Sequence, residues 1–284
     1  MLNIIKSDIY RITKSLAIYI AFALTLLMIG LSVYMVEPGS IGTNFTFSDN
    51  AEYTNKNEED ALQKYVDGEI KMSEMRDILL TDENYELDRS IIGCNFNLYY
   101  VFIFVASLAV TVDFSSGAVK NTLSSAISRR RYFISKTAFV MASCTFIFLL
   151  NNYLAYLINM IFNKGKVSAS LMTITILSIR QLPVILGLAA LLAGISFIFK
   201  KNSLFNTISI SIGMLYPLLL GLIIKLLSIK DAMSVYRFEF GFILSKLSGN
   251  PASSDYISGY AFSAAVAIVF LTLGWISFRK VEIK

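Results

Sequence analysis

Long apolar stretches alternate with short charged ones along this chain. Runs of about 18 or more apolar residues with few charges are typical of membrane-spanning helices. Six such runs cover Leu16–Val36, Ile91–Val112, Thr137–Phe162, Leu182–Phe199, Leu204–Leu226 and Tyr260–Phe278. The pattern therefore predicts an all-α integral membrane protein with six transmembrane helices, built as a single transmembrane domain over residues 1–284. Because the number of spans is even, both termini are expected on the same side of the membrane.

The fourth of these spans has two possible starting points. Its apolar run, Leu171–Phe199, is 29 residues long and is interrupted by Arg180 and Pro183. An arginine at mid-membrane costs about 2.5 kcal/mol or more, whereas a span that begins at Leu182 leaves Arg180 at the outer interface, where its side chain can reach water. We therefore expect Ser168–Ile179 to form a separate interfacial or re-entrant helix.

The first 15 residues have a helical pattern of their own. Lys6, Asp8 and Lys14 lie off an apolar stripe with three- and four-residue steps, which consists of Leu2, Ile5, Ile9, Ile12 and Leu16. This pattern predicts an elbow helix over residues 1–15 that lies in the inner membrane interface and then turns into the first span. The alternative is a positively charged anchor that only fixes the topology.

The distribution of charge predicts the orientation. The termini and the even-numbered connections hold 13 of the 25 Lys and Arg residues, but only three of the 20 acidic residues: Asp8, Asp113 and Glu282. Lys and Arg near span ends favour the cytoplasmic side. Both termini are therefore predicted to be cytoplasmic.

Two longer segments then lie on the outer side. Residues 37–90 hold 14 acidic and five basic residues, and two amphipathic patches there predict an extracellular helical insert between spans one and two. This insert is either a lid that attracts cationic ligands or a solvated loop. Residues 225–259 mix aromatic and charged side chains, which predicts amphipathic helices on the outer leaflet.

Missing residue types narrow the function. The chain is 55% hydrophobic with a mean hydropathy of +0.62, it has no His, and its predicted spans contain no Asp or Glu. Ion-coupled transport and intramembrane proteolysis usually need such groups. The sequence also lacks the G-x-x-x-x-G-K-[ST] loop that binds nucleotides. We therefore expect no metal site, no cofactor and no catalysis in this chain, so energy for transport would come from a separate protein.

The connection between spans two and three, Asp113–Lys136, carries five basic residues and one acidic residue. Asp113 is placed to cap a helix whose first turn is Phe114–Gly117, and Gly117 would allow close packing. The residues expected to face one way, into a partner or the neighbouring spans, are Val119, Leu123, Ala126 and Ile127. The alternative is a topology determinant with surface charge.

This segment resembles a family pattern. The run D-F-S-S-G-A-V-K-N-T-L, followed by S-R-R-R-Y-F-I-S-K, is similar to permeases of the type-2 family of ATP-binding-cassette exporters, including those that export bacteriocins and antibiotics. The layout of an elbow helix, six spans and a large first outer loop is similar as well. The triple Arg129–Arg131 is more basic than the pattern requires, which leaves open whether the extra charge contacts the ATPase or anionic lipid.

The resemblance implies a coupling site for separate ATP-binding-cassette ATPase subunits, which would bind the ATP and Mg. The implied coupling residues are Asp113, Phe114, Gly117, Lys120, Asn121, Ser128, Arg129, Arg130, Arg131 and Lys136. It also implies a second permease subunit, as a homodimer or heterodimer, contact with membrane lipid and no nucleic acid.

The function expected from this resemblance is ATP-driven transport across a bacterial plasma membrane by a multi-pass permease subunit. The cargo would be amphipathic or hydrophobic: a peptide, bacteriocin, drug or lipid-like molecule, moved for antimicrobial peptide export or immunity. The alternative is a non-transporting membrane scaffold or sensor whose extracellular insert binds a ligand.

Polar residues within the predicted spans are candidates for the cargo path. They are Asn151, Asn152 and Asn159 in span three and Asn206 in span five. The alternative is hydrogen bonding between helices, which is worth about 0.6 kcal/mol each in membranes. Small residues at four-residue spacing, Ala190 with Gly194 and Gly213 with Gly221 around Pro217, predict close helix packing and a kink.

Overall fold

The computed structural model describes residues 2–35, 64, 69, 91–124, 127–163, 169–227, 233–249 and 251–280. Within these ranges the chain is helical and contains no strand, which confirms the all-α prediction for them. The predicted extracellular insert, residues 37–90, lies outside the described residues except for residues 64 and 69.

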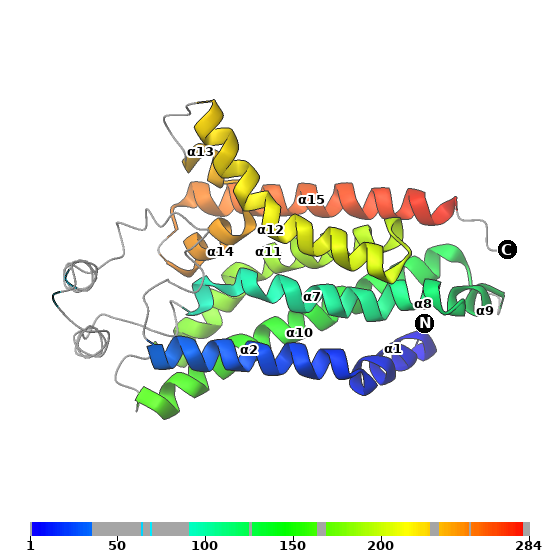
Figure 1. Ribbon diagram of the computed structural model, residues 1–284, viewed down its shortest axis with the longest axis horizontal. Helices are drawn as coiled ribbons and strands as arrows, with labels where there is room; N and C mark the ends of the chain where they lie inside the picture. Colours follow the sequence, from blue (N-terminus) through cyan, green and yellow to red (C-terminus); the bar gives the residue numbers. More distant parts are fainter. Residues whose placement is uncertain are drawn as a thin grey trace.

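The described helices follow the chain order expected from the apolar runs (Figure 1). They are α1 (Leu2–Lys14), α2 (Leu16–Met35), the 3-10 helix η1 (Asn95–Asn97), α7 (Leu98–Ala106), the π-helix η2 (Ser107–Thr111), α8 (Val112–Ser115), α9 (Ala118–Ser124), α10 (Arg129–Asn163), α11 (Leu171–Ile198), α12 (Asn202–Leu226), α13 (Met233–Tyr236), α14 (Phe240–Ser248) and α15 (Ser253–Arg279).

Five helical stretches are long and apolar enough to cross a membrane: Asn95–Ser115, Arg129–Phe162, Leu171–Ile198, Asn202–Leu226 and Ser253–Arg279. The α1 and α2 helices pass the same test only together, as one broken span bent by 66°. The helices therefore have the length and composition of a multi-pass membrane protein. The sixth crossing and the interfacial position of α1 stay predictions.

The expected break before Leu182 is wrong. The α11 helix is continuous over Leu171–Ile198 and contains Pro183 in its interior. Proline has no N–H and so leaves a carbonyl one turn earlier without its helical donor. Next to that carbonyl, the hydroxyl of Tyr260 on α15 donates to the Arg180 carbonyl oxygen at 2.8 Å. Membrane helices tolerate proline where neighbouring helices supply such donors.

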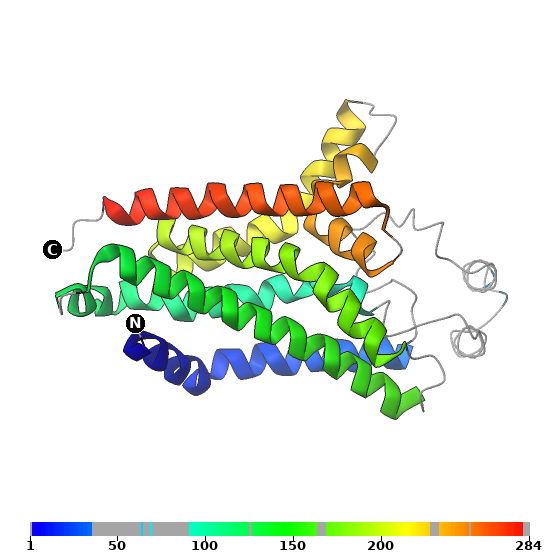
Figure 2. The same cartoon turned by 180° about the vertical axis from the view of Figure 1, so that it is seen from behind.

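The α11 helix forms the centre of the bundle. Figure 2 shows it between α10 and α15, and its span is the most completely buried of the five. The predicted close packing at Gly194 is confirmed, because a Cβ there would overlap with the backbone carbonyl of Phe270 on α15. Similarly, a Cβ at Gly213 on α12 would meet the ring of Tyr99 at 2.6 Å.

The two ends of the bundle differ in composition. One end holds α1, α8, α9, the start of α10 and the end of α15, whereas α13 and α14 lie at the opposite end (Figure 1). Arg129 ties the first end together, because its Nη1 donates to the carbonyl oxygen of Arg279 at 2.7 Å. The α1 helix and the end of α15 therefore lie at the same end of the bundle; that both termini lie on one side of a membrane, and that this side is cytoplasmic, stay predictions.

Within the predicted outer segment, residues 225–259, the structure places α13 and α14. The α14 helix is buried against α11, α15 and η1 through side chains that include Ile243, Leu244 and Leu247. Its N-cap is Glu239, whose carboxylate accepts hydrogen bonds from the backbone N–H groups of Gly241 and Phe242. This acid is itself buried, with 2% of its surface exposed.

Candidate functional site

Asp113 does not cap a helix, contrary to the prediction from the sequence. It lies inside α8, which continues from η2 without a break, and the N-cap residue of α8, Thr111, makes no side-chain cap. Its carboxylate instead turns into the bundle, where Oδ1 accepts a hydrogen bond from Arg11 and Oδ2 accepts one from the Tyr132 hydroxyl at 2.7 Å. The prediction failed because tertiary ion pairing outweighs a local cap.

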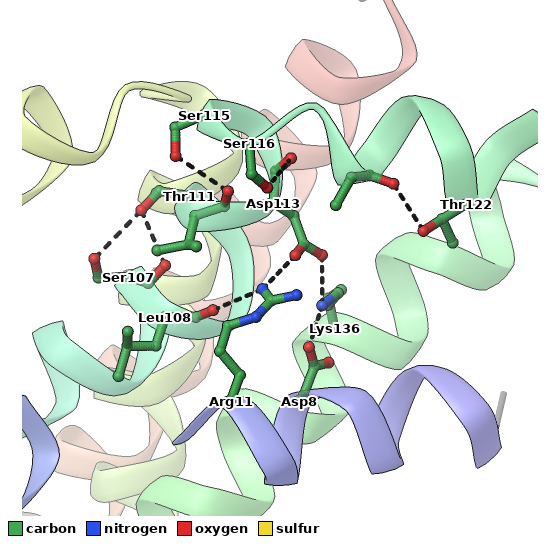
Figure 3. Close-up of polar contacts among 12 residues, drawn as sticks. Asp8, Arg11, Ser107, Leu108, Thr111, Asp113, Ser115, Ser116, Thr122 and Lys136 are labelled. Atoms are coloured by element: carbon green, nitrogen blue, oxygen red, sulfur yellow. Dashed lines mark hydrogen bonds and ion pairs between the residues drawn. The ribbon is translucent and has the colours of Figure 1, made fainter. Parts of the chain in front are cut away.

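Lys136 completes a cluster of four charged residues, which we call the charge cluster: Asp8, Arg11, Asp113 and Lys136. The Lys136 Nζ lies 2.5 Å from Asp8 Oδ1 and 2.7 Å from Asp113 Oδ2. One ammonium group therefore contacts carboxylates from α1 and α8 at once. Figure 3 shows the Arg11 and Lys136 side chains on either side of the Asp113 carboxylate.

Three members of the charge cluster are buried, Arg11 is partly exposed, and the charges are balanced. Asp8 is 1% exposed, Asp113 3% and Lys136 1%, and two carboxylates face two cations. Removing an ion from water costs several kcal/mol unless it is paired and hydrogen-bonded. These charges can stay away from water only because each has a partner of opposite sign on another helix.

A π-helix supports the charge cluster from span two. In η2, the N–H of Val112 bonds the Ser107 carbonyl five residues earlier, so the turn is wider than in an α-helix. Arg11 donates to the carbonyl oxygen of Leu108 at 3.1 Å as well as to Asp113. The Thr111 hydroxyl donates to the Ser107 carbonyl at 3.0 Å. Single π turns of this kind are frequent at functional sites.

Asn202, the first residue of α12, contacts η2 from another direction. Its Oδ1 accepts hydrogen bonds from the hydroxyl groups of Ser107 and Thr111. Three helices beyond span two, α1, α10 and α12, therefore contribute side chains to η2 or to the adjoining charge cluster.

Aromatic side chains separate the charge cluster from the rest of the bundle. Phe114 packs edge-on against Phe197 of α11 and Phe278 of α15, with ring centroids 6.1 and 5.9 Å away. The Tyr132 ring lies 5.6 Å from that of Phe278, and the Lys136 ammonium lies 5.6 Å from the Tyr132 ring centroid. Apolar walls of this kind exclude water and strengthen the ion pairs.

Gly117 and α9 come next in the chain. Gly117 has a φ of +72°, and a Cβ there would meet nothing within 4 Å. It therefore supplies a left-handed turn, not the close packing expected from the sequence. Of the residues expected to face one way, Val119 on α9 is buried, and Leu123 on α9 and Ile127 beyond its end pack against the core. Ala126 lies outside the described residues.

The other predicted coupling residues are on the surface. Lys120, Arg130 and Arg131 are exposed and form what we call the basic surface; Asn121 and Ser128 are exposed beside them. The Ser128 Oγ accepts a hydrogen bond from the N–H of Arg131 at 3.4 Å, as an N-cap of α10 does. Arg129 differs from its two neighbours, because its guanidinium is occupied by the end of α15.

The structure therefore divides the predicted coupling residues into two groups. Asp113, Phe114 and Lys136 point into the bundle, whereas Lys120, Arg130 and Arg131 face outward. The short α8–Gly117–α9 connection joins Lys120 to Asp113 and Phe114, whereas Arg130 and Arg131 lie on α10 together with Lys136.

The asparagines predicted to line a cargo path lie in hydrogen-bonded positions. Asn151 and Asn152 belong to a buried amide network in which Asn95 Nδ2 donates to Asn152 Oδ1 at 2.9 Å and to Gln181 Oε1 at 2.7 Å. The Asn151 Nδ2 donates to Asn95 Oδ1 at 3.1 Å. This network connects spans two, three and four, as the alternative of interhelical hydrogen bonding expects.

The other two asparagines lie apart from that network. Asn159 is fully buried in α10, and Asn206 donates to Asn202 Oδ1 at 3.2 Å within α12. The four predicted path residues therefore do not come together at one place, and a lining role for them stays a prediction.

Reasoning from the sequence missed several of the residues that build the site. Asp8 entered only the charge count and the polar side of the first helix, Arg11 entered only the charge count, and Tyr132, Asn95 and Gln181 were not singled out. A signal for the first two was present, because residues three apart lie on one face of a helix. Asp8 and Arg11 share a helical face in this way and lie off the apolar stripe. Such an acid and arginine are candidates for burial against oppositely charged residues of another helix.

Comparison with known proteins adds no assignment: no protein-family model matches the chain, and no curated protein matches it. Within the described ranges, no three His, Cys, Asp or Glu residues lie close enough together to hold a metal ion.

Proposed function

We propose that this chain is the membrane-spanning permease subunit of an ATP-driven exporter whose ATP hydrolysis takes place in a separate subunit. One observation carries the proposal. The exposed basic surface is joined to a buried charge cluster that holds three helices together. The basic surface consists of Lys120, Arg130 and Arg131. A partner that moves the basic surface would move the ends of these helices with it.

The rigidity of the connection supports this mechanism. Asp113 is held by Arg11 from α1 and by Tyr132 and Lys136 from α10. Only the turn at Ser116–Gly117 separates α8 from α9. A displacement of α9 would therefore reach the first three spans through directional, charge-assisted contacts, whereas a surface loop without these contacts would absorb it.

Exposure and charge favour a soluble protein partner on the basic surface. Arg130 and Arg131 are exposed and can pair with acidic groups, since the guanidinium engaged by α15 is that of Arg129. Acidic surfaces and basic surfaces attract one another and orient the encounter. The cargo, the second permease subunit and the bacterial plasma membrane rest on the resemblance alone, and we propose them on that basis.

The test is co-expression of the chain with the ATPase encoded beside its gene. We expect the two proteins to copurify and the chain to change the rate of ATP hydrolysis. Arg130→Glu with Arg131→Glu should weaken binding about 30-fold or more, because the loss of two attractions worth about 1 kcal/mol each corresponds to that ratio and the new repulsions add to it. Binding is measured by titrating the purified ATPase onto the chain in lipid nanodiscs.

The matched control is Lys225→Glu with Arg237→Glu, which changes the same charge at the opposite end of the bundle. It should leave binding and ATP hydrolysis unchanged. If the Arg130 and Arg131 reversals leave binding unchanged in a protein with wild-type thermal stability, the coupling role of the basic surface is wrong.

A further inference from the structure

The η2 π-helix places one extra residue in span two directly before the coupling segment. An α-helix bonds residues four apart and turns about 100° per residue with a rise of about 1.5 Å. Over Ser107–Thr111 the backbone hydrogen bonds join residues five apart. The wider turn therefore contains one extra residue, and α8 keeps the direction it would have without that residue. If this turn became α-helical, α8 and α9 would rotate by about 100° relative to α7.

Side chains from two other helices hold the wide turn in its present form. Arg11 of α1 donates to the Leu108 carbonyl, and Asn202 of α12 accepts from the hydroxyl groups of Ser107 and Thr111. Arg11 and Lys136 also pair with Asp113, two residues beyond the turn. These contacts fix the direction in which Asp113 and Phe114 point.

We propose that η2 is a rotary joint for α8 and α9, and that the charge cluster holds this joint in the π-helical form. Loss of the Arg11–Asp113 contact would allow the turn to become α-helical. Asp113 would then leave the charge cluster, Phe114 would leave Phe197 and Phe278, and α9 would turn its buried Val119 face away from the bundle. Because only the short turn at Ser116–Gly117 separates the two helices, α9 would move together with α8.

The use of this joint in transport rests on the proposed function, but the joint itself does not. In an exporter, a force on the basic surface would switch the turn between its two forms, and the direction of α8 would report the state of the ATPase to spans two and three. Rotation of the joint can be measured on the chain alone, independently of any ATPase.

Cysteine labelling measures the rotation. The two native thiols, Cys94 and Cys144, are not joined in a disulfide and are first replaced, Cys94→Ser and Cys144→Ala. Val119→Cys then reports on α9, beyond the joint, and Val101→Cys reports on α7, before it; both valines are buried. The full chain in nanodiscs is treated with a maleimide, and the labelling rate is measured by mass spectrometry.

Arg11→Gln with Asp113→Asn removes one cation and one anion and leaves the Asp8–Lys136 pair in place. With this pair of substitutions we expect labelling of Val119→Cys to accelerate at least about tenfold, the ratio that corresponds to about 1.4 kcal/mol. Labelling of Val101→Cys should remain as slow as without the two substitutions.

Deletion of Ala109 provides the matched control, because it removes the extra residue and leaves a regular α-helix with both flanks in their present directions. In this background, Arg11→Gln with Asp113→Asn should no longer accelerate labelling of Val119→Cys. Deletion of Val101 in the regular α7 turn removes a residue that is not extra, and it should disrupt folding.

Each alternative outcome overturns the joint. Unchanged labelling of Val119→Cys would show that the charge cluster does not hold the turn. Equal acceleration with and without Ala109, or acceleration at Val101→Cys as well, would indicate local unfolding instead of rotation. A chain that cannot fold without Ala109 would show that the turn contains no dispensable residue. Labelling as expected together with failed ATPase binding would overturn the proposed function and leave the joint intact.

Discussion

At the scale of single residues, Lys136 is a buried cation that depends on two carboxylates. Its ammonium group lies between Asp8 and Asp113, and both carboxylates are buried with it. The two acids are not equivalent, because Asp113 also accepts from Arg11 and Tyr132, whereas Asp8 Oδ2 has no hydrogen-bond partner among the described residues. Asp8 therefore depends on Lys136 more than Asp113 does.

Charge balance in the cluster leads to the first prediction. Lys136→Gln leaves two buried carboxylates facing Arg11 alone and should lower the free energy of unfolding by about 3–5 kcal/mol. Adding Asp8→Asn restores equal numbers of charges, so the double variant should be more stable than Lys136→Gln. Thermal unfolding in detergent compares the two, with the exposed Lys120→Gln as control. A double variant less stable than Lys136→Gln would contradict the pairing.

Glu239 is a third buried acid, outside the spans, and the described residues provide no cation paired with it. Burial raises the pKa of its carboxyl group above the usual 4.5, and the backbone N–H groups of Phe242 and Gly241 oppose this shift. Between pH 4.5 and the raised pKa, the folded state therefore binds more protons than the unfolded state. By linkage, the contribution of Glu239 to stability is fully present below pH 4.5 and is lost as pH rises through the folded-state pKa.

The second prediction comes from that sign. Glu239→Gln keeps an oxygen that can cap α14 but cannot ionise, so the fall in unfolding free energy with rising pH should become shallower. Glu239→Ala removes the same carboxyl group and also the cap, which should cost about 1 kcal/mol at every pH. Chemical unfolding measured from about pH 4 to about pH 8 separates the two. If the unfolding free energy of both variants changed with pH as steeply as that of the wild type, the raised pKa of Glu239 would be contradicted.

At the scale of helices, the contact between α11 and α15 depends on glycine. Gly194 and Gly274 face each other across the two helices, since a Cβ at Gly274 would lie 2.9 Å from the Gly194 carbonyl oxygen. Close backbone approach of this kind is how membrane helices gain packing energy where lipid is as apolar as their side chains. The central position of α11 depends on this contact.

Replacement of Gly194 gives the third prediction. Gly194→Ala places a methyl group on the Phe270 carbonyl and should destabilise the chain by about 1–3 kcal/mol through separation of the helices. Gly30→Ala on α2 is the matched control, because its new Cβ would meet nothing within 4 Å. Resistance to thermal unfolding distinguishes them. If the two variants had the same thermal unfolding temperature, α15 would not pack on Gly194.

Helix positions were predictable from the sequence to the extent that they depend on local composition. The apolar runs predicted α10, α12 and α15 because hydropathy is a property of each segment by itself. The continuity of α11 was not predictable in this way, since Arg180 and Pro183 both favour a break locally. The hydroxyl of Tyr260 donates to the Arg180 carbonyl, next to the one that Pro183 leaves without a donor, and it comes from 80 positions away in the chain.

At the scale of the whole molecule, two faces of the bundle remain apolar and open. The α12 and α15 helices are mostly exposed, whereas α11 is mostly buried. In a membrane these open faces contact lipid or another subunit. The polar ends, with the basic surface at one and α13 and α14 at the other, set the direction in which such a bundle would cross the bilayer.

The number of crossings gives the fourth prediction. If α2 crosses, the chain has six spans, and Lys6→Cys and Lys280→Cys should react with a membrane-impermeant maleimide from the same side. If α2 does not cross, the two should react from opposite sides. Labelling of sealed right-side-out and inside-out vesicles decides between these cases. Lys120→Cys should react from the side of Lys280→Cys in both.

The charge cluster could be predicted from the sequence only in part. Asp113 and Lys136 were singled out by their place in a family-like pattern, but their burial and pairing were not. Asp8 and Arg11 share a helical face, yet each lies more than 100 positions from its partner, and no neighbouring residue indicates where that partner is. Such pairs depend on which helix faces meet, and a single sequence does not contain that information.

The pairing of Asp8 with Lys136 also has a consequence for synthesis. The two residues are 128 positions apart, so at about 5–20 residues per second the lysine is made about 6–26 seconds after the aspartate. During that interval the buried position of Asp8 has no cation from α10 to stabilise it. Asp8 can therefore be buried with its charge paired only once the start of α10 has been made, and in a nascent chain that stops before Lys136 the polar contacts of Arg11 with span two should hold α1 without this ion pair.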